Sequence, residues 1–430
     1  MQFPIELVES VIDASVAHHP TLSACSLVCK QWLPRCRHHL FSTLDLSADW
    51  TPEPNSVTNL LALLLTPHAA ETLIPYVRSV VVAKRSWGMT PVARILTALA
   101  RAGVRPRALL VNCPSYEPTH TPVFASSLTH LTLELHNDMR AAPLIEYICA
   151  FPRLEVLDVG GSARFAFDEG MLSAHYAGRM QLPARLHTLI VRNTVVVDWI
   201  VATALAPGGS KIGVTTLVVR HIRLPEQWEG VYRYLTTSAC AGVIRSLTFQ
   251  GCDFPLQPPT PLPLLPSLRT LTIECSTTAT GAHLSMLLPH VPPHITPTSF
   301  LPALEVFTLR STNAFLSAAS PSSAVGDPRA WADVDKHFAS LSPAPEFFPA
   351  LERVCVSRVG LSASVGGGRR NSNAEVYGGR GREGGYSVHN RSGTGNAGEQ
   401  EEEGRSLPKS VADILRKEMR ECVRRGLLFV

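Results

Sequence analysis

The sequence predicts an α/β protein in which a short helical start leads into an irregular solenoid, with one strand and one returning helix or loop per repeat. Three observations support this fold class. Residues 1–41 carry apolar side chains at helical spacing, residues 42–359 repeat a short strand-like frame, and residues 360–406 are Gly-rich and nearly free of large aliphatic side chains. We therefore expect helices, stacked repeats and a disordered linker, followed by a last helix over residues 407–430.

Composition narrows the classes of function. The chain has 430 residues, 45% of them apolar, and a formal net charge of +4. This charge is too mild to indicate binding to a membrane surface or specific binding to nucleic acid. No signal-peptide pattern opens the sequence, and the apolar runs are too short to span a bilayer. Its ten irregularly spaced cysteines are therefore expected to be free thiols in the cytoplasm and/or the nucleus.

The first segment predicts three short helices. Pro4 suits the first turn of a helix, Thr21 can cap a second helix, and Pro34 opens a third that ends at Phe41. So short a segment carries more large apolar side chains than three helices can bury among themselves. The first repeat can cover only one side of the unit, so the remaining apolar surface implies a partner protein.

The middle segment repeats a frame of three apolar residues, with two variable residues in the first gap and one in the second. The middle apolar residues of its copies are Leu44, Val80, Leu109, Leu131, Leu157, Leu189, Leu217, Leu247, Leu271, Phe307 and Val354. Their spacing suits one strand plus one return helix or loop, and residues 92–100 have the amphipathic pattern of such a helix. A single antiparallel β-domain is the competing interpretation, but the sequence lacks tight hairpin turns.

Residues that alternate with the frame are expected on the face opposite the core, where repeat proteins bind their targets. The candidate target-binding residues are Glu134, Asp158, Arg192, Arg220, Gln250, Glu274 and Arg310. Arg192 and Arg220 hold the same place on consecutive repeats, which predicts a small basic strip. A solvated surface is the competing interpretation for each of these residues taken singly.

The predicted helix over residues 407–430 has two interpretations. Val411, Ile414 and Leu415 lie on one face of it, and that face can either cover the last repeat or dock a partner. We favour the cap, because stacked repeats need their last apolar face covered.

The repeat frame resembles that of leucine-rich repeats, although the asparagine that usually follows the frame is largely absent. The first segment resembles the F-box, through a Pro-x-Glu-Leu opening, an Ile five residues beyond that Leu, a Leu-Val-Cys-Lys-x-Trp stretch and a closing Leu-Phe. Phe3 stands where leucine is usual. The resemblance implies docking on the Skp-type adaptor of an SCF cullin–RING ubiquitin ligase, through Pro4, Ile5, Leu7, Ile12, Leu27, Val28 and Trp32. Alternatively, these side chains form only the small core of the three helices.

The resemblance therefore predicts a non-catalytic subunit that recruits a substrate to a ubiquitin ligase. It would bind the adaptor and through it a cullin, hold an unknown target protein on its repeats, and be a monomer within the complex. A repeat scaffold that binds a protein partner without ligase activity is the alternative. An enzyme is a third possibility, but no catalytic motif appears and no cofactor is expected. No metal is expected either, because Cys25, Cys29 and Cys36 lack the tight knuckle spacing that zinc prefers.

Overall fold

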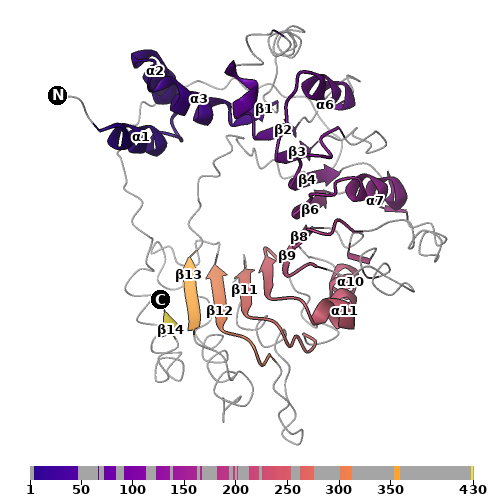
Figure 1. The fold of residues 1–430 in the computed structure, drawn as a ribbon. Coiled ribbons are helices and arrows are strands. Elements are labelled where there is room, and N and C mark those ends of the chain that lie inside the picture. The colour runs from indigo at the N-terminus through magenta and orange to yellow at the C-terminus, as the bar shows by residue number, and fades with distance from the viewer. Residues whose placement is uncertain are drawn as a thin grey trace, which may run out of the picture.

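Three N-terminal helices, a curved parallel sheet and further helices along its outer side are the main elements of the computed structural model (Figure 1). The described residues are 4–46, 66, 72–83, 92–112, 123–135, 139–161, 165–166, 182–192, 197–198, 201, 213–221, 225–252, 262–275, 301–311, 353–358 and 428–429. The predicted linker over residues 360–406 lies outside them.

The three N-terminal helices are α1 (Ile5–Ala14), α2 (His19–Val28) and α3 (Leu33–Phe41). Their small shared core is Ile12, Leu22 and Cys36, against which Val8, Cys25, Trp32 and Leu40 pack. Pro4 and Pro34 stand at the helix starts, as predicted. The predicted cap at Thr21 is wrong: α2 begins two residues earlier, and the His18 ring accepts a hydrogen bond from the Thr21 backbone N–H. His18 can cap because a ring nitrogen can accept like a side-chain oxygen.

Twelve strands of the described chain form one sheet, and every pair of neighbouring strands is parallel. In sheet order they are β1 (Thr43–Asp45), β2 (Ser79–Ala83), β3 (Ala108–Asn112), β4 (His130–Leu135), β6 (Val156–Gly161), β8 (Thr188–Val191), β9 (Thr216–Arg220), β10 (Ser246–Gln250), β11 (Thr270–Cys275), β12 (Val306–Ser311), β13 (Arg353–Arg358) and β14 (Leu428–Phe429). A separate pair is formed by β5 (Met139–Arg140) and β7 (Phe165–Ala166). The α/β class is confirmed, and an open parallel sheet is compatible with a solenoid.

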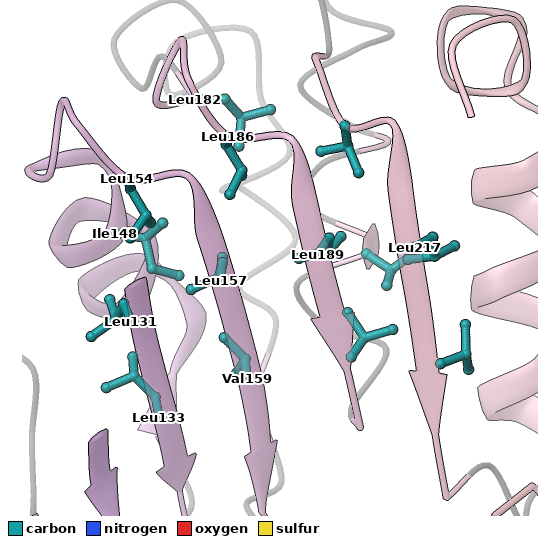
Figure 2. Close-up of a cluster of buried hydrophobic side chains, with 14 of the residues drawn as sticks. Leu131, Leu133, Ile148, Leu154, Leu157, Val159, Leu182, Leu186, Leu189 and Leu217 are labelled. Atoms are coloured by element: carbon teal, nitrogen blue, oxygen red, sulfur yellow. The ribbon is translucent and has the colours of Figure 1, made fainter. Parts of the chain in front are cut away.

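The predicted frame fixes the register of this sheet. Leu44 is the partner of Val80, and the same line then passes through every predicted middle residue to Val354. The central members, such as Leu157, Leu189 and Leu217, are fully buried, and Figure 2 shows their side chains among those of neighbouring strands. The competing antiparallel interpretation is wrong, because the neighbouring strands of the sheet are parallel. The long connections between copies of the frame give the chain room to return and start each strand in the same direction.

Helices cover one face of the sheet. Figure 1 shows α6 (Val92–Arg101), α7 (Ala141–Cys149), α10 (Pro225–Thr236) and α11 (Ser238–Ala241) along the outer side of an arc whose inner side is lined by the strands. A short 3-10 helix, η1 (Ile74–Tyr76), precedes β2. Side chains of the covering helices share one core with the frame; those of Leu99, Ile148 and Trp228 are fully buried there. The residues that alternate with the frame therefore lie on the inner face of the arc.

The end of the chain corrects the prediction of a helix over residues 407–430. Residues 428–429 form strand β14, and Leu428 pairs with Val354 to extend the line of frame residues. The chain ends in a short apolar run, Leu427 to Val430, which suits a strand better than a helical face. The rest of the predicted helix, residues 407–427, lies outside the described residues.

Candidate functional site

Exposed apolar side chains concentrate on the N-terminal helices. Six large apolar side chains are exposed among the described residues, and five of them, Leu7, Val11, Val16, Leu27 and Val28, belong to this unit. We call these five the N-terminal apolar strip. Leu27 is 86% exposed and Val11 is 64% exposed, whereas the sixth residue, Leu264, lies outside this unit, in the segment that precedes β11. Exposed apolar groups gathered on one small unit mark a surface for a partner.

The predicted adaptor-binding residues fall into two groups. Pro4, Leu7, Leu27 and Val28 are exposed. Ile12 is only 1% exposed, so it supports the small core and cannot touch a partner directly. Trp32 is half-buried against that core, and Ile5 lines a shallow surface pocket of about 450 Å³. Val11 and Val16 were missed, although Val11 follows Leu7 at helical spacing and could have been found from it.

Asp13 holds helix α1 against helix α3. Its carboxylate accepts a hydrogen bond from Nε of Arg35 at 2.7 Å, a second from Nη2 of Arg35, and lies 2.7 Å from Nε2 of His39. The bonds from Arg35 and then from His39 lower the pKa of Asp13 well below its ordinary value. Arg35 and His39 are 22 and 26 residues away from Asp13 in the sequence, so no local pattern predicts these contacts.

The inner face of the arc carries a chain of polar contacts, which we call the inner-face ladder. Its members are Asn112, Glu134, Asp158, Arg192, Arg220, Gln250 and Glu274. Nη1 of Arg192 donates to Glu134 at 2.7 Å, and Nη2 lies 3.4 Å from Asp158. The ladder joins six of the seven predicted target-binding residues into one network.

The second half of the ladder continues from Arg220. Nη1 of Arg220 lies 3.2 Å from the Oδ2 atom of Asp158, which the side chain of Arg192 also approaches. Nε of Arg220 donates to Gln250 at 2.6 Å, and Gln250 donates to Glu274 at 3.3 Å. Arg310 follows Glu274 in the register of the sheet, although its side chain lies outside the described part of the structure.

Gly160 makes the contact between Arg192 and Glu134 possible. The register places Gly160 between Glu134 on β4 and Arg192 at the end of β8. A Cβ atom on Gly160 would stand 2.6 Å from Cδ of Arg192, so any other side chain here would meet that arginine. The missing side chain lets Arg192 lie across β6 and reach Glu134 two strands away.

Burial shifts the pKa values of charged groups in the ladder. Asp158 is 6% exposed and Glu274 is 7% exposed. Burial raises the pKa of Asp158, an effect that the nearby charges of Arg192 and Arg220 oppose. Burial likewise lowers the pKa of Arg220, which its neighbour Asp158 raises. Because Glu134 and Asp158 neutralise the two arginines, the prediction of a small basic strip at Arg192 and Arg220 is wrong.

Three thiols lie in the N-terminal unit. Cys36 is buried, Cys25 is half-buried and Cys29 is exposed at the end of α2. Burial raises the pKa of Cys36, and the nearby thiols of Cys25 and Cys29 raise it further. Within the described ranges, no group of three or more His, Cys, Asp or Glu residues is placed to hold a metal ion.

Comparison with known proteins gives no relative from which to transfer a role. No protein-family model matches this chain, and no curated protein matches it. None of the helices in the part of the chain that the structure describes is long and apolar enough to cross a membrane. The candidate surfaces are thus the N-terminal apolar strip and the inner-face ladder, and their geometry carries the functional argument.

Proposed function

We propose that this protein is the substrate-recruiting subunit of an SCF-type cullin–RING ubiquitin ligase. Its three N-terminal helices act as an F-box that docks on the Skp-type adaptor, and its repeats, of the leucine-rich type, hold a target protein. The observation that carries the proposal is the N-terminal apolar strip. Leu7, Leu27 and Val28, which match the F-box pattern, are three of its five residues and are all more than half exposed.

The small core of the unit explains why a partner is needed. Among the described residues of this unit, Ile12, Leu22 and Cys36 are the buried core, while the strip leaves more large apolar side chains in water than this core removes. Burying one large aliphatic side chain stabilises a protein or complex by about 1.5–3 kcal/mol. A docked adaptor would cover the strip and supply the burial that three short helices cannot reach alone.

The arrangement around the strip supports docking as a rigid body. Asp13 ties α1 to α3 through Arg35 and His39, so the exposed side chains of α1 are held in a fixed position relative to α3. A surface that is ordered before binding loses less conformational entropy on association. The inner face of the arc, which carries the inner-face ladder, is the surface that we assign to the target protein, and no catalytic role is proposed for the chain itself.

Co-purification of the full chain with the adaptor and a cullin tests the proposal. We expect Leu27→Asp to abolish adaptor binding while leaving thermal unfolding unchanged, because this side chain is 86% exposed. Leu264→Asp is the matched control: Leu264 is 54% exposed and lies outside the N-terminal unit, so adaptor binding should persist.

Two results would count against the proposal. Full adaptor binding by Leu27→Asp would remove the strip from the interface and with it the docking claim. Adaptor binding without a cullin and without ubiquitin transfer to any bound protein would leave only the repeat scaffold that lacks ligase activity.

A further inference from the structure

Two cysteines flank the most exposed part of the N-terminal apolar strip. Cys25 lies in the last turn of α2, and Cys29 is the residue at which that helix ends. Leu27 and Val28 stand between them. Residues four apart on a helix have Cα atoms about 6 Å apart. A disulfide needs a Cα separation of roughly 4.4–6.8 Å, so this pair falls within its reach.

The backbone at Cys29 allows the remaining adjustment. Its φ of −158° and ψ of 162° are extended, so the residue has already left the helix. Its side chain is exposed, whereas that of Cys25 is half-buried. Helical residues four apart hold their Cβ atoms about 5–6 Å apart, wider than a disulfide permits. A residue beyond the last helical hydrogen bond can turn inward to close that gap.

Cys36 is a poor third member of this cluster. It is fully buried between the helices, and burial keeps its pKa raised and its thiol protonated. A protonated, inaccessible thiol neither attacks a disulfide nor is reached by one. The exposed Cys29 is therefore the thiol that reacts first, and Cys25 is its neighbour along the same helix.

We propose that Cys25 and Cys29 form a reversible disulfide that controls docking through the N-terminal apolar strip. The formation of the bond rests on the helical spacing and exposure of the two cysteines and on the extended backbone of Cys29, whereas its effect on docking rests on the proposed function. Disulfides that form in reducing compartments are typically transient and regulatory.

The oxidant is a low-molecular-weight disulfide such as glutathione disulfide. The Cys29 thiolate attacks one of its sulfur atoms, breaks its S–S bond and releases one glutathione thiolate, which takes up a proton. The Cys25 thiolate then attacks the Cys29 sulfur and releases the second glutathione. Two cysteine thiols are oxidised to one disulfide, and one glutathione disulfide is reduced to two thiols.

Closing the bond changes the strip. Cys29 must fold back towards Cys25, so the chain leaves α2 in a new direction, and Leu27 and Val28 move with it. Oxidation then disfavours docking on the adaptor. Because linkage is reciprocal, a docked adaptor must disfavour oxidation to the same degree.

Peptide mass spectrometry detects the disulfide between Cys25 and Cys29 directly. The full chain is equilibrated with glutathione disulfide, alkylated and cleaved after Lys and Arg. Residues 1–30 form one peptide that contains Cys25 and Cys29, whereas Cys36 lies on the separate peptide 36–37. We expect peptide 1–30 to be lighter by two hydrogen atoms and to resist alkylation. A cross-link to peptide 36–37, or a stable glutathione adduct on Cys29, would overturn the assignment of the bond.

Measurement of adaptor binding tests whether the disulfide controls docking. Oxidation of the wild type should weaken binding by about tenfold or more, and a reductant should restore it. Cys29→Ser should bind equally under both conditions, and the control Cys36→Ala should respond like the wild type. Equal binding by bridged and reduced wild type would overturn the regulatory role. A bridge in a chain that binds no adaptor in either state would instead overturn the proposed function and leave the disulfide established.

Discussion

Arg192 lies across Gly160 and donates a hydrogen bond to Glu134, although β6 separates the strands that carry the two charged residues. The side chains of both charged residues are 20% exposed, so the pair is largely screened from solvent. Charge-assisted hydrogen bonds of this kind contribute about 1.5–3 kcal/mol. The contact depends on a position where no side chain is present.

Gly160→Ala should break this relationship. The added methyl group would meet Cδ of Arg192 and displace it from Glu134. We expect a loss of about 1–2 kcal/mol in the free energy of unfolding, measured by urea titration. The double-mutant cycle with Arg192→Ala is the control, since Gly160→Ala should be nearly neutral where no arginine crosses the glycine. An equal loss in both backgrounds would mean that the arginine is not involved.

Acid should weaken the attachment of α1 to α3. Bonds from Arg35 and His39 lower the pKa of Asp13 below its ordinary value of 3.8, so the folded unit binds this proton less tightly than the unfolded chain does. The resulting stability is present above pH 3.8 and is lost as the pH falls towards the lowered pKa. Asp13→Asn should remove this part of the pH dependence, as followed by hydrogen exchange of the α1 amides. An unchanged acid profile in Asp13→Asn would contradict the assignment.

Asp158 should act on stability with the opposite sign. Burial raises its pKa above 3.8, so the folded state binds this proton more tightly than the unfolded chain does. Its contribution is most favourable below pH 3.8 and is lost as the pH rises through the raised pKa. The difference in unfolding free energy between wild type and Asp158→Asn should therefore vary with pH across this window. A difference that stays constant from pH 3 to pH 7 would contradict this sign.

The central frame residues should dominate the stability of the sheet. Leu217 is fully buried, and Leu217→Ala should lower the free energy of unfolding by about 2–5 kcal/mol through the cavity it leaves. Leu264→Ala, on a side chain that is 54% exposed, should change it by less than about 0.5 kcal/mol. Denaturant titration of both variants makes the comparison, and similar losses would argue against the frame as the core.

The sequence determined the register of the sheet because its signal is local. A frame residue such as Leu131 is followed two positions later by Leu133. Because side chains two apart in a strand lie on the same face, both are in the core. The strand that contains Leu428 was not predicted, because the first position of its frame is Arg425, which breaks the apolar pattern. The two-residue strand β14 gives too short a run to be recognised.

The pairing within the ladder could not be predicted in the same way. The sequence placed six of its members on the inner face. Alternation along a strand predicts the face on which a side chain lies, but it does not predict the partner with which a charged side chain pairs. Arg192 reaches Glu134 only because Gly160 stands between them, and Asp158 lies two residues before the row that Arg192 and Arg220 share. Such contacts depend on three strands at once, and a pattern within one strand cannot encode them.

The ladder also ties together repeats that are not neighbours. In a simple stack each repeat touches only the next, so one unit can open while the remainder stays folded. Here Arg192 links β8 to β4 and Arg220 links β9 to β6, each skipping one strand. Opening any one of these repeats therefore breaks contacts belonging to others. The centre of the arc should unfold as a single cooperative block, with uniform amide protection from β4 to β9.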